Sequence, residues 1–172
     1  MIKLSNGVKM RSVRIISRKG LSGNNLGFFL AGFVEGEGSF NVSLRRKLDY
    51  KTNWQVVMSF NVSQKDPTIL KMLMGELNCG IIKVRRKDNL YSYDVTRPED
   101  IIQRVIPFFK KYPVFSDSKT RNFAIFCEIA SILEKGDHRN LSGLRKVLEL
   151  RERLNEGKGR TRKYGINDIF PE

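Results

Sequence analysis

Two acidic residues, Glu35 and Glu37, end an apolar segment that carries two glycines four positions apart. On a helix, Gly32 and Gly36 share one face, where the missing Cβ atoms let a second backbone approach closely. Each costs about 1 kcal/mol relative to alanine in an ordinary surface helix, so the pair indicates close packing. The acids fall where Gly38 should end the helix, at the negative end of its dipole. A carboxylate is poorly placed there unless a cation lies beside it, so the segment predicts a metal-binding acid.

The segment from Leu30 to Gly38 reads Leu-Ala-Gly-Phe-Val-Glu-Gly-Glu-Gly, and Ser39-Phe40 begins a polar-apolar alternation. This string resembles the signature of the LAGLIDADG homing endonucleases, from which only conservative exchanges separate it. The resemblance implies that Glu37 and the backbone carbonyl of Gly36 are metal ligands. It also implies that the helix pairs with a second copy of itself. The expected dimer interface consists of Leu30, Gly32, Phe33, Glu35 and Gly36.

Phosphodiester hydrolysis needs a nucleophilic water, neutralised phosphate charge and help for the leaving oxygen, all of which carboxylate-bound metal ions supply. Oxygen ligands favour hard cations, so the expected cofactor is Mg²⁺, with Mn²⁺ or Ca²⁺ able to occupy the site. The resemblance further implies that Gln64 orders water or metal and that Lys119 neutralises charge in the transition state. Arg121 competes with Lys119 for that role. His138, the only histidine, is expected in a loop and not as a general base.

Alternating and helical patterns predict the elements that position these residues. Residues 40–45 and 54–63 alternate apolar and polar side chains, which indicates two antiparallel strands joined by a turn at 49–53. Asp66 and Pro67 begin a helix that ends near Asn78 and Gly80. Further strands are expected at 81–87 and 90–96 around a turn at Asp88-Asn89. Further helices are expected at 98–109, 119–133 (capped by Ser116 or Ser118) and 141–154.

The predicted fold class is therefore α+β, in the order α-β-β-α-β-β followed by helices, with helices on one face of a four-stranded antiparallel sheet. The other face is polar and basic, and a β-ribbon of this kind can enter the DNA major groove. Aromatic residues are expected on the core side, which disfavours a base-stacking platform for single strands. The expected DNA-binding residues are Asn41, Ser43, Arg45, Lys47, Gln55, Ser59, Asn61, Lys83, Arg85 and Lys87.

The composition favours a polyanionic partner, because 32 Lys and Arg against 18 Asp and Glu give a formal net charge of +14. Three regions are expected: a basic N-terminal arm (1–24), an endonuclease domain (25–156) and a basic C-terminal tail (157–172). The N-terminal stretch also fits an organellar transit peptide, but nothing marks a cleavage site. No apolar run approaches the roughly 18 residues of a membrane span, so a soluble protein without a membrane partner is expected. Cys79 and Cys127 lie in unrelated contexts and favour a reducing compartment.

One copy of the signature occurs in the 172 residues. Because cutting both strands of a duplex needs two active sites, a homodimer on a long pseudo-palindromic site is expected. The leading hypothesis is an intron-encoded, metal-dependent, site-specific DNA endonuclease. An RNA maturase that assists splicing of its intron, and a non-catalytic DNA-binding regulator, are the alternatives. The expected location is intracellular, in a prokaryotic cytoplasm or an organelle.

Overall fold

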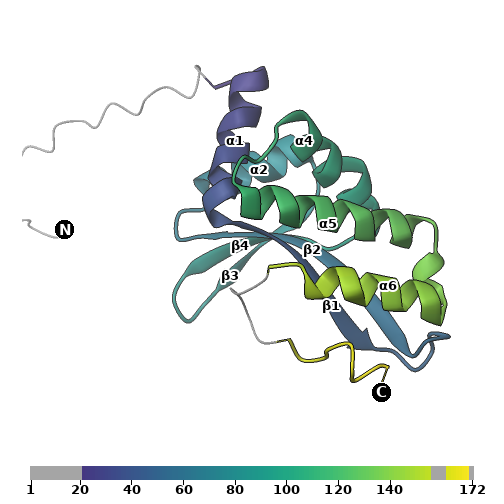
Figure 1. Ribbon diagram of the computed structural model, residues 1–172. Coiled ribbons are helices and arrows are strands. Elements are labelled where there is room, and N and C mark those ends of the chain that lie inside the picture. Colours follow the sequence, from purple (N-terminus) through teal and green to yellow (C-terminus); the bar gives the residue numbers. More distant parts are fainter. Residues whose placement is uncertain (1–20, 156–161, 171–172) are drawn as a thin grey trace, which may run out of the picture.

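The computed structural model describes residues 21–155 and 162–170, which form an α+β domain (Figure 1). Helix α1 leads directly into strand β1 without an intervening loop. The elements are α1 (Gly23–Glu37), β1 (Gly38–Arg46), β2 (Trp54–Gln64), α2 (Thr68–Leu77), β3 (Ile81–Arg85), β4 (Leu90–Val95), α3 (Pro98–Asp100), the π-helical turn η2 (Ile101–Val105), α4 (Ile106–Lys111), α5 (Asp117–Glu134), the 3-10 turn η3 (Asp137–Arg139) and α6 (Leu141–Glu152). The α+β class and the order of the elements confirm the prediction.

The four strands form one antiparallel sheet in the order β1-β2-β4-β3. Helices lie on one face of this sheet, as Figure 1 shows, and α1 stands at one end with its C-terminus entering β1. The opposite face, called the outer face below, has no helix over it. Strand alternation places mostly polar side chains on the outer face, as predicted, together with the apolar residues Val57, Ile81 and Leu90.

The core lies between the sheet and the helices and is rich in phenylalanine. Phe40 on β1 stacks on Phe60 of β2, with ring centroids 5.5 Å apart. Phe109 of α4 and Phe126 of α5 pack on the same Phe40 ring at 5.3 and 5.2 Å. Aromatic contacts of this kind add to the large apolar area that such rings bury. The packing explains why Phe40, Phe60 and Tyr93 of the strands face inward and are buried.

Several element boundaries differ from the prediction. Strand β3 ends at Arg85, because the following residues turn and Asn89 adopts a positive φ of 52°. Lys87 therefore lies in the turn and not on a strand, and Lys47 likewise follows the end of β1. The helix expected at 98–109 is interrupted by the π-helical turn η2, directly before Pro107 in the first turn of α4. A widened turn accommodates a proline ring that would clash with the carbonyl four residues earlier.

The described part of the expected C-terminal tail, residues 162–170, packs on the domain. The ring of Tyr164 lies 4.8 Å from that of Trp54, and its carbonyl accepts a hydrogen bond from the buried Arg151 (2.8 Å). Phe170 lies under the guanidinium of Arg145 at 4.3 Å. The N-terminal arm up to residue 20, and the basic residues at 158 and 160, lie outside the described residues. Within the described residues, no helix combines the length and apolar character that a membrane crossing needs.

Candidate active site and DNA-binding face

The carboxylate of Glu37 is exposed at the C-terminal end of α1 and makes no hydrogen bond or ion pair within the described residues. Gly38 follows at the junction with β1, and its N–H donates to the carbonyl of Val34. A Cβ on Gly38 would meet Val34 Cγ1 at 2.4 Å, so only glycine fits here. Gly38 therefore ends α1 because of this close approach, and its φ of −89° needs no glycine. The turn leaves Glu37 free to bind a ligand.

Lys119 approaches the same junction from α5. Its Nζ donates to the carbonyl of Gly38 at 2.5 Å, although 81 residues separate the two. Lys119 belongs to the first turn of α5, where Ser116 Oγ accepts a hydrogen bond from its N–H. Burial lowers the pKa of the Lys119 amine, although the nearby carboxylate of Glu35 opposes that shift. The structure thus places the amine of Lys119 on the carbonyl of the residue that follows Glu37. Among the described residues, Arg121 makes no contact with this junction.

Glu35 connects α1 to the start of α5 within one protomer. Its carboxylate accepts hydrogen bonds from the N–H of Phe115 (2.8 Å), the N–H of Ser116 (3.3 Å) and the hydroxyl of Ser116. Burial raises the pKa of Glu35, but these hydrogen bonds and the charge of Lys119 outweigh it, so the net shift is downward. Glu35 therefore holds the end of α5 that carries Lys119. This role was missed from the sequence, because its partners lie 80 residues away.

Gln64 is the last residue of β2, and Val62, two positions earlier, pairs with Gly38. Gln64 therefore lies at the same end of the sheet as Glu37. Its Oε1 accepts a hydrogen bond from the N–H of Lys65 (3.0 Å). His138 belongs to η3, which lies at the other end of β1 from this junction.

The described residues contain no group of three or more His, Cys, Asp or Glu side chains that could hold a metal ion. One protomer contributes the exposed carboxylate of Glu37 and the backbone carbonyl beside it. Magnesium commonly takes one or two carboxylates together with substrate oxygens and waters. The oxygen donors at the end of α1 fit such a cation, provided that other molecules complete its coordination.

The outer face of the sheet carries the hydrogen-bonding and basic side chains expected for recognition of DNA. Asn41, Ser43 and Arg45 of β1 alternate with buried core residues, as the sequence predicted. The outer positions of the strands are Ser39, Asn41, Ser43, Arg45, Gln55, Val57, Ser59, Asn61, Ser63, Ile81, Lys83, Arg85, Leu90, Ser92 and Asp94. None of these outer positions is aromatic, which agrees with the expectation that the face offers no stacking platform.

Two acids on or near the outer face form ion pairs with its basic residues. Arg85 forms a two-point pair with Asp88 in the β3–β4 turn, at 2.8 and 2.5 Å. Asp94 of β4 lies among the polar side chains, and only 14% of its side chain is exposed. Its Oδ2 lies 3.2 Å from Lys83 Nζ. The sequence pattern placed Asp94 on the polar side of its strand but gave no reason to include it among the site residues.

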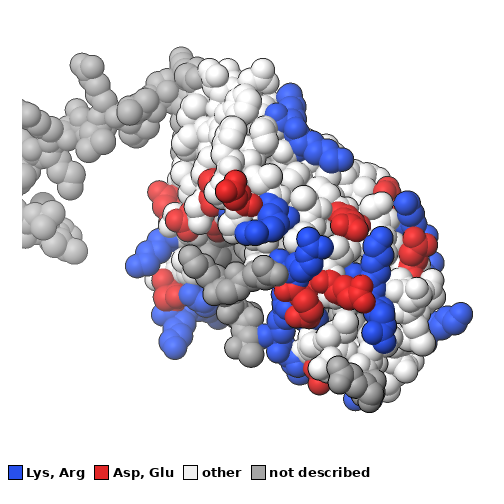
Figure 2. Space-filling model, in the orientation of Figure 1, with Lys and Arg blue, Asp and Glu red and all other residues white. Residues whose placement is uncertain are grey.

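The exposed face of α1 is the expected dimer interface. A Cβ added to Gly32 or Gly36 would meet nothing within 4 Å, so these glycines are not needed for packing within the protomer. Phe29 is 39% exposed on the same side, and Phe33 is partly exposed. Figure 2 shows that the surface over α1 is uncharged for most of its length, since its only charged residues are at its C-terminal end.

Of the residues assigned to that interface, one lies on the opposite face of α1 and another directs its carboxylate to α5. Leu30 has no exposed surface and belongs to the core of its own protomer, so the prediction for Leu30 was wrong. It lies about 200° around the helix from Gly32, which puts the two on opposite faces. The carboxylate of Glu35 is directed to the start of α5, as described above.

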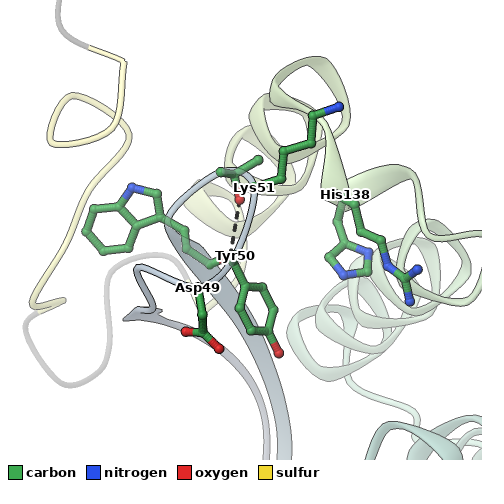
Figure 3. Close-up of a pocket in the computed structure, with 7 residues that line it drawn as sticks. Asp49, Tyr50, Lys51 and His138 are labelled. Atoms are coloured by element: carbon green, nitrogen blue, oxygen red, sulfur yellow. Dashed lines mark hydrogen bonds between the residues drawn. The ribbon is translucent and has the colours of Figure 1, made fainter.

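A pocket of about 300 Å³ lies at the other end of β1 from Glu37. Figure 3 shows Asp49, Tyr50 and Lys51 of the β1–β2 turn on one side and His138 on the facing side. His138 Nδ1 is buried without a hydrogen-bond partner, and burial lowers the pKa of this imidazole. The pocket is therefore separate from the junction that holds Glu37 and Lys119.

Comparison with known proteins gives a consistent result. The family model described as LAGLIDADG endonuclease matches residues 30–130. A probable intron-encoded endonuclease of Neurospora crassa is 30% identical over 146 residues, which is 83% of this chain and 32% of that protein. The chain thus spans about a third of the length of that curated relative.

Solved structures agree with the same assignment. The homing endonuclease I-TnaI is 30% identical with a TM-score of 0.71, and the match covers 77% of this chain and 89% of that one. I-SmaMI, solved with its uncleaved DNA target in the presence of calcium ions, is 28% identical with a TM-score of 0.74. That match covers 85% of this chain and 49% of the I-SmaMI chain.

Proposed function

This chain belongs to the LAGLIDADG endonuclease family, and from that premise we propose that it hydrolyses duplex DNA at a specific sequence. The observation that carries the proposal is the junction at Gly38. There the exposed acid Glu37 directly precedes Gly38, whose carbonyl binds the amine of Lys119, at one end of a polar outer face. A phosphate at this junction would lie beside the sheet that reads the bases.

The outer face supports recognition of duplex DNA. Its side chains include amides and guanidinium groups, which pair with base edges in the major groove. The absence of aromatic rings at the outer strand positions of the described sheet disfavours a single-stranded or unpaired RNA partner. Phosphate contacts from the many basic residues would add affinity that does not depend on sequence.

At the junction, Glu37 and the carbonyl of Gly36 would hold a divalent cation, for which we propose magnesium. A bound cation of this kind supplies charge neutralisation and an activated water. Lys119 would place its ammonium beside the phosphate and stabilise the charge that develops there. Glu35 would keep Lys119 in position through the start of α5.

We further propose a homodimer formed by α1. Two glycines with open space above them, flanked by partly exposed phenylalanines on an uncharged face, fit a second copy of the same helix. A two-fold axis through this contact would bring two Glu37 residues together, one for each DNA strand. I-TnaI, which this chain covers over most of its length, is a homing endonuclease of comparable size, and its similarity supports a protein built from this one unit.

The test is cleavage of a library of duplexes with a randomised central region, with and without Mg²⁺, followed by sequencing of the cut ends. We expect the wild-type chain to enrich one sequence with partial two-fold symmetry and to cut both strands. Glu37→Gln is the matched control, because it keeps the size of the side chain and removes its charge. If the wild type cuts without enriching any sequence, or cuts equally well after the substitution, the proposal is wrong.

A further inference from the structure

A chain of side-chain hydrogen bonds crosses the outer face from β1 to β4. Asn155, after α6, donates from Nδ2 to Asn41 Oδ1 at 3.3 Å. Asn41 Nδ2 donates to Asn61 Oδ1 at 3.2 Å, and Asn61 Nδ2 donates to Asp94 Oδ1 at 2.5 Å. We call Asn155, Asn41, Asn61 and Asp94 the amide chain.

The direction of the amide chain is fixed at both ends. At one end, Asn155 Nδ2 also donates to the carbonyl of Phe40 (3.0 Å), which can only accept. Asn155 Oδ1 accepts from Asn122, whose own Oδ1 accepts from the backbone N–H of Asn155. At the other end, the Asp94 carboxylate can only accept. Neither Asn41 nor Asn61 can turn its amide around without setting a donor against a donor.

Fixed amides leave a defined pattern free for a ligand. An asparagine amide has two N–H donors and two oxygen lone pairs. Within the amide chain, Asn41 and Asn61 each use one N–H and one lone pair. Each amide therefore keeps one N–H donor and one oxygen lone pair for a ligand. This remaining pair matches an adenine edge, which offers the N7 acceptor and the N6 amino donor in the major groove.

We propose that Asp94 is a positioning residue for sequence specificity, which sets the amides of Asn61 and Asn41 for readout of adenine. The inference rests on the proposed function, because it assumes that the outer face reads duplex DNA. Asp94 suits this role because its two oxygens receive three donors: Asn61 and Ser92 at Oδ1, and Lys83 at Oδ2. Asparagine in its place would turn an NH₂ group toward either Asn61 or Lys83, since it has only one oxygen.

The experiment is library cleavage by the wild type, Asp94→Asn and Asp88→Asn. Variants Asn41→Ala and Asn61→Ala first identify the target positions that these amides read. At those positions we expect the wild type to prefer adenine and Asp94→Asn to lose about tenfold in discrimination, with preference elsewhere unchanged. Asp88→Asn removes an equal charge near the same sheet and should alter other positions.

A second variant acts from the far end of the amide chain. Asn155→Ala replaces no strand residue but removes the donor to Asn41, together with the hydrogen bond to the Phe40 carbonyl, so it should relax preference at the Asn41 position. The Asn155→Ala variant replaces Asp94→Asn in the experiment if Asp94→Asn does not fold at the assay temperature. Preference profiles that match the wild type in both variants overturn the inference and leave the proposed function standing. Equal effects of Asp94→Asn and Asp88→Asn at the same positions also overturn it, since they would reflect charge alone. A wild type that enriches no sequence overturns both.

Discussion

Replacing Gly32 by leucine should separate the stability of the protomer from its association. Nothing lies within 4 Å of a Cβ added at position 32. Leucine is a better helix former than glycine, so the isolated protomer should gain about 0.8 kcal/mol in free energy of unfolding. Gly27 on the same helix is the matched control, because its added Cβ would meet the ring of Tyr112 at 2.3 Å. Gly27→Ala should therefore lose stability in the protomer itself.

The same Gly32→Leu substitution should weaken dimer formation, although it stabilises the protomer. A bulky side chain inserted into a close contact typically costs about 1–3 kcal/mol. A two-fold interface contains the substitution twice, so the cost is roughly 2–6 kcal/mol. That corresponds to self-association weakened at least about thirtyfold, since 1.36 kcal/mol equals one factor of ten. Gly32→Leu should thus be a more stable monomer and a poor dimer.

Two measurements check this prediction. Sedimentation velocity over a range of concentrations gives the dimer dissociation constant, and urea unfolding at a concentration where the chain is monomeric gives the stability. Double-strand cleavage should fall in parallel with dimerisation. A Gly32→Leu protein that sediments as a dimer like the wild type and cuts normally would refute the interface. A monomer that loses stability would refute the claim that the face is open.

Four further outcomes are expected. Glu37→Gln should abolish cleavage and retain DNA binding in a gel-shift assay, and substantial Mg²⁺-dependent cutting would contradict its role as ligand. Glu35→Ala should lose about 0.5–2 kcal/mol of stability, the range for losing a side-chain oxygen that accepts backbone N–H groups at a helix start, and should slow cleavage more than it weakens binding. Because burial lowers the pKa of His138 below its ordinary 6.5, the unfolded state takes up a proton that the folded state resists, so stability should fall as pH drops below 6.5. His138→Gln should flatten that dependence in urea titrations, and an unchanged pH profile would exclude the histidine as its cause. Deleting the chain after residue 161 should lower the melting temperature, because it removes the Tyr164 contacts with Trp54 and Arg151; a melting temperature equal to that of the full chain would contradict this.

Local pattern was sufficient to predict most of the fold. Alternation located the strands, and Asp66 and Ser116 mark helix starts, where each side-chain oxygen accepts a backbone N–H. The pairing of β2 with β4 could not be read in this way, because it joins segments about 30 residues apart. Pattern also identifies which face of a strand is polar. It does not show which polar groups on that face bind one another.

The site was predicted less completely, for the same physical reason. The signature predicted Glu37 as a site residue, and the structure places the amine of Lys119 on the carbonyl of the next residue, Gly38. The partners of Glu35 and the acid Asp94 depend on contacts between distant segments. The composition predicts a basic tail for residues 157–172, whereas Tyr164 and Phe170 of this segment pack against the core.

The direct passage from α1 to β1 has a mechanical consequence. The helix ends at Glu37 and the strand begins at Gly38, whose N–H is still bonded to the last turn of the helix. No loop separates the proposed dimer contact on α1, the acid Glu37 and strand β1, which is proposed to read bases. In a dimer built on α1, the distance between the two cuts and the spacing of the half-sites would be set by the same backbone. A target with one extra base pair between its half-sites should then require the DNA to bend, because no loop between α1 and β1 could absorb the change.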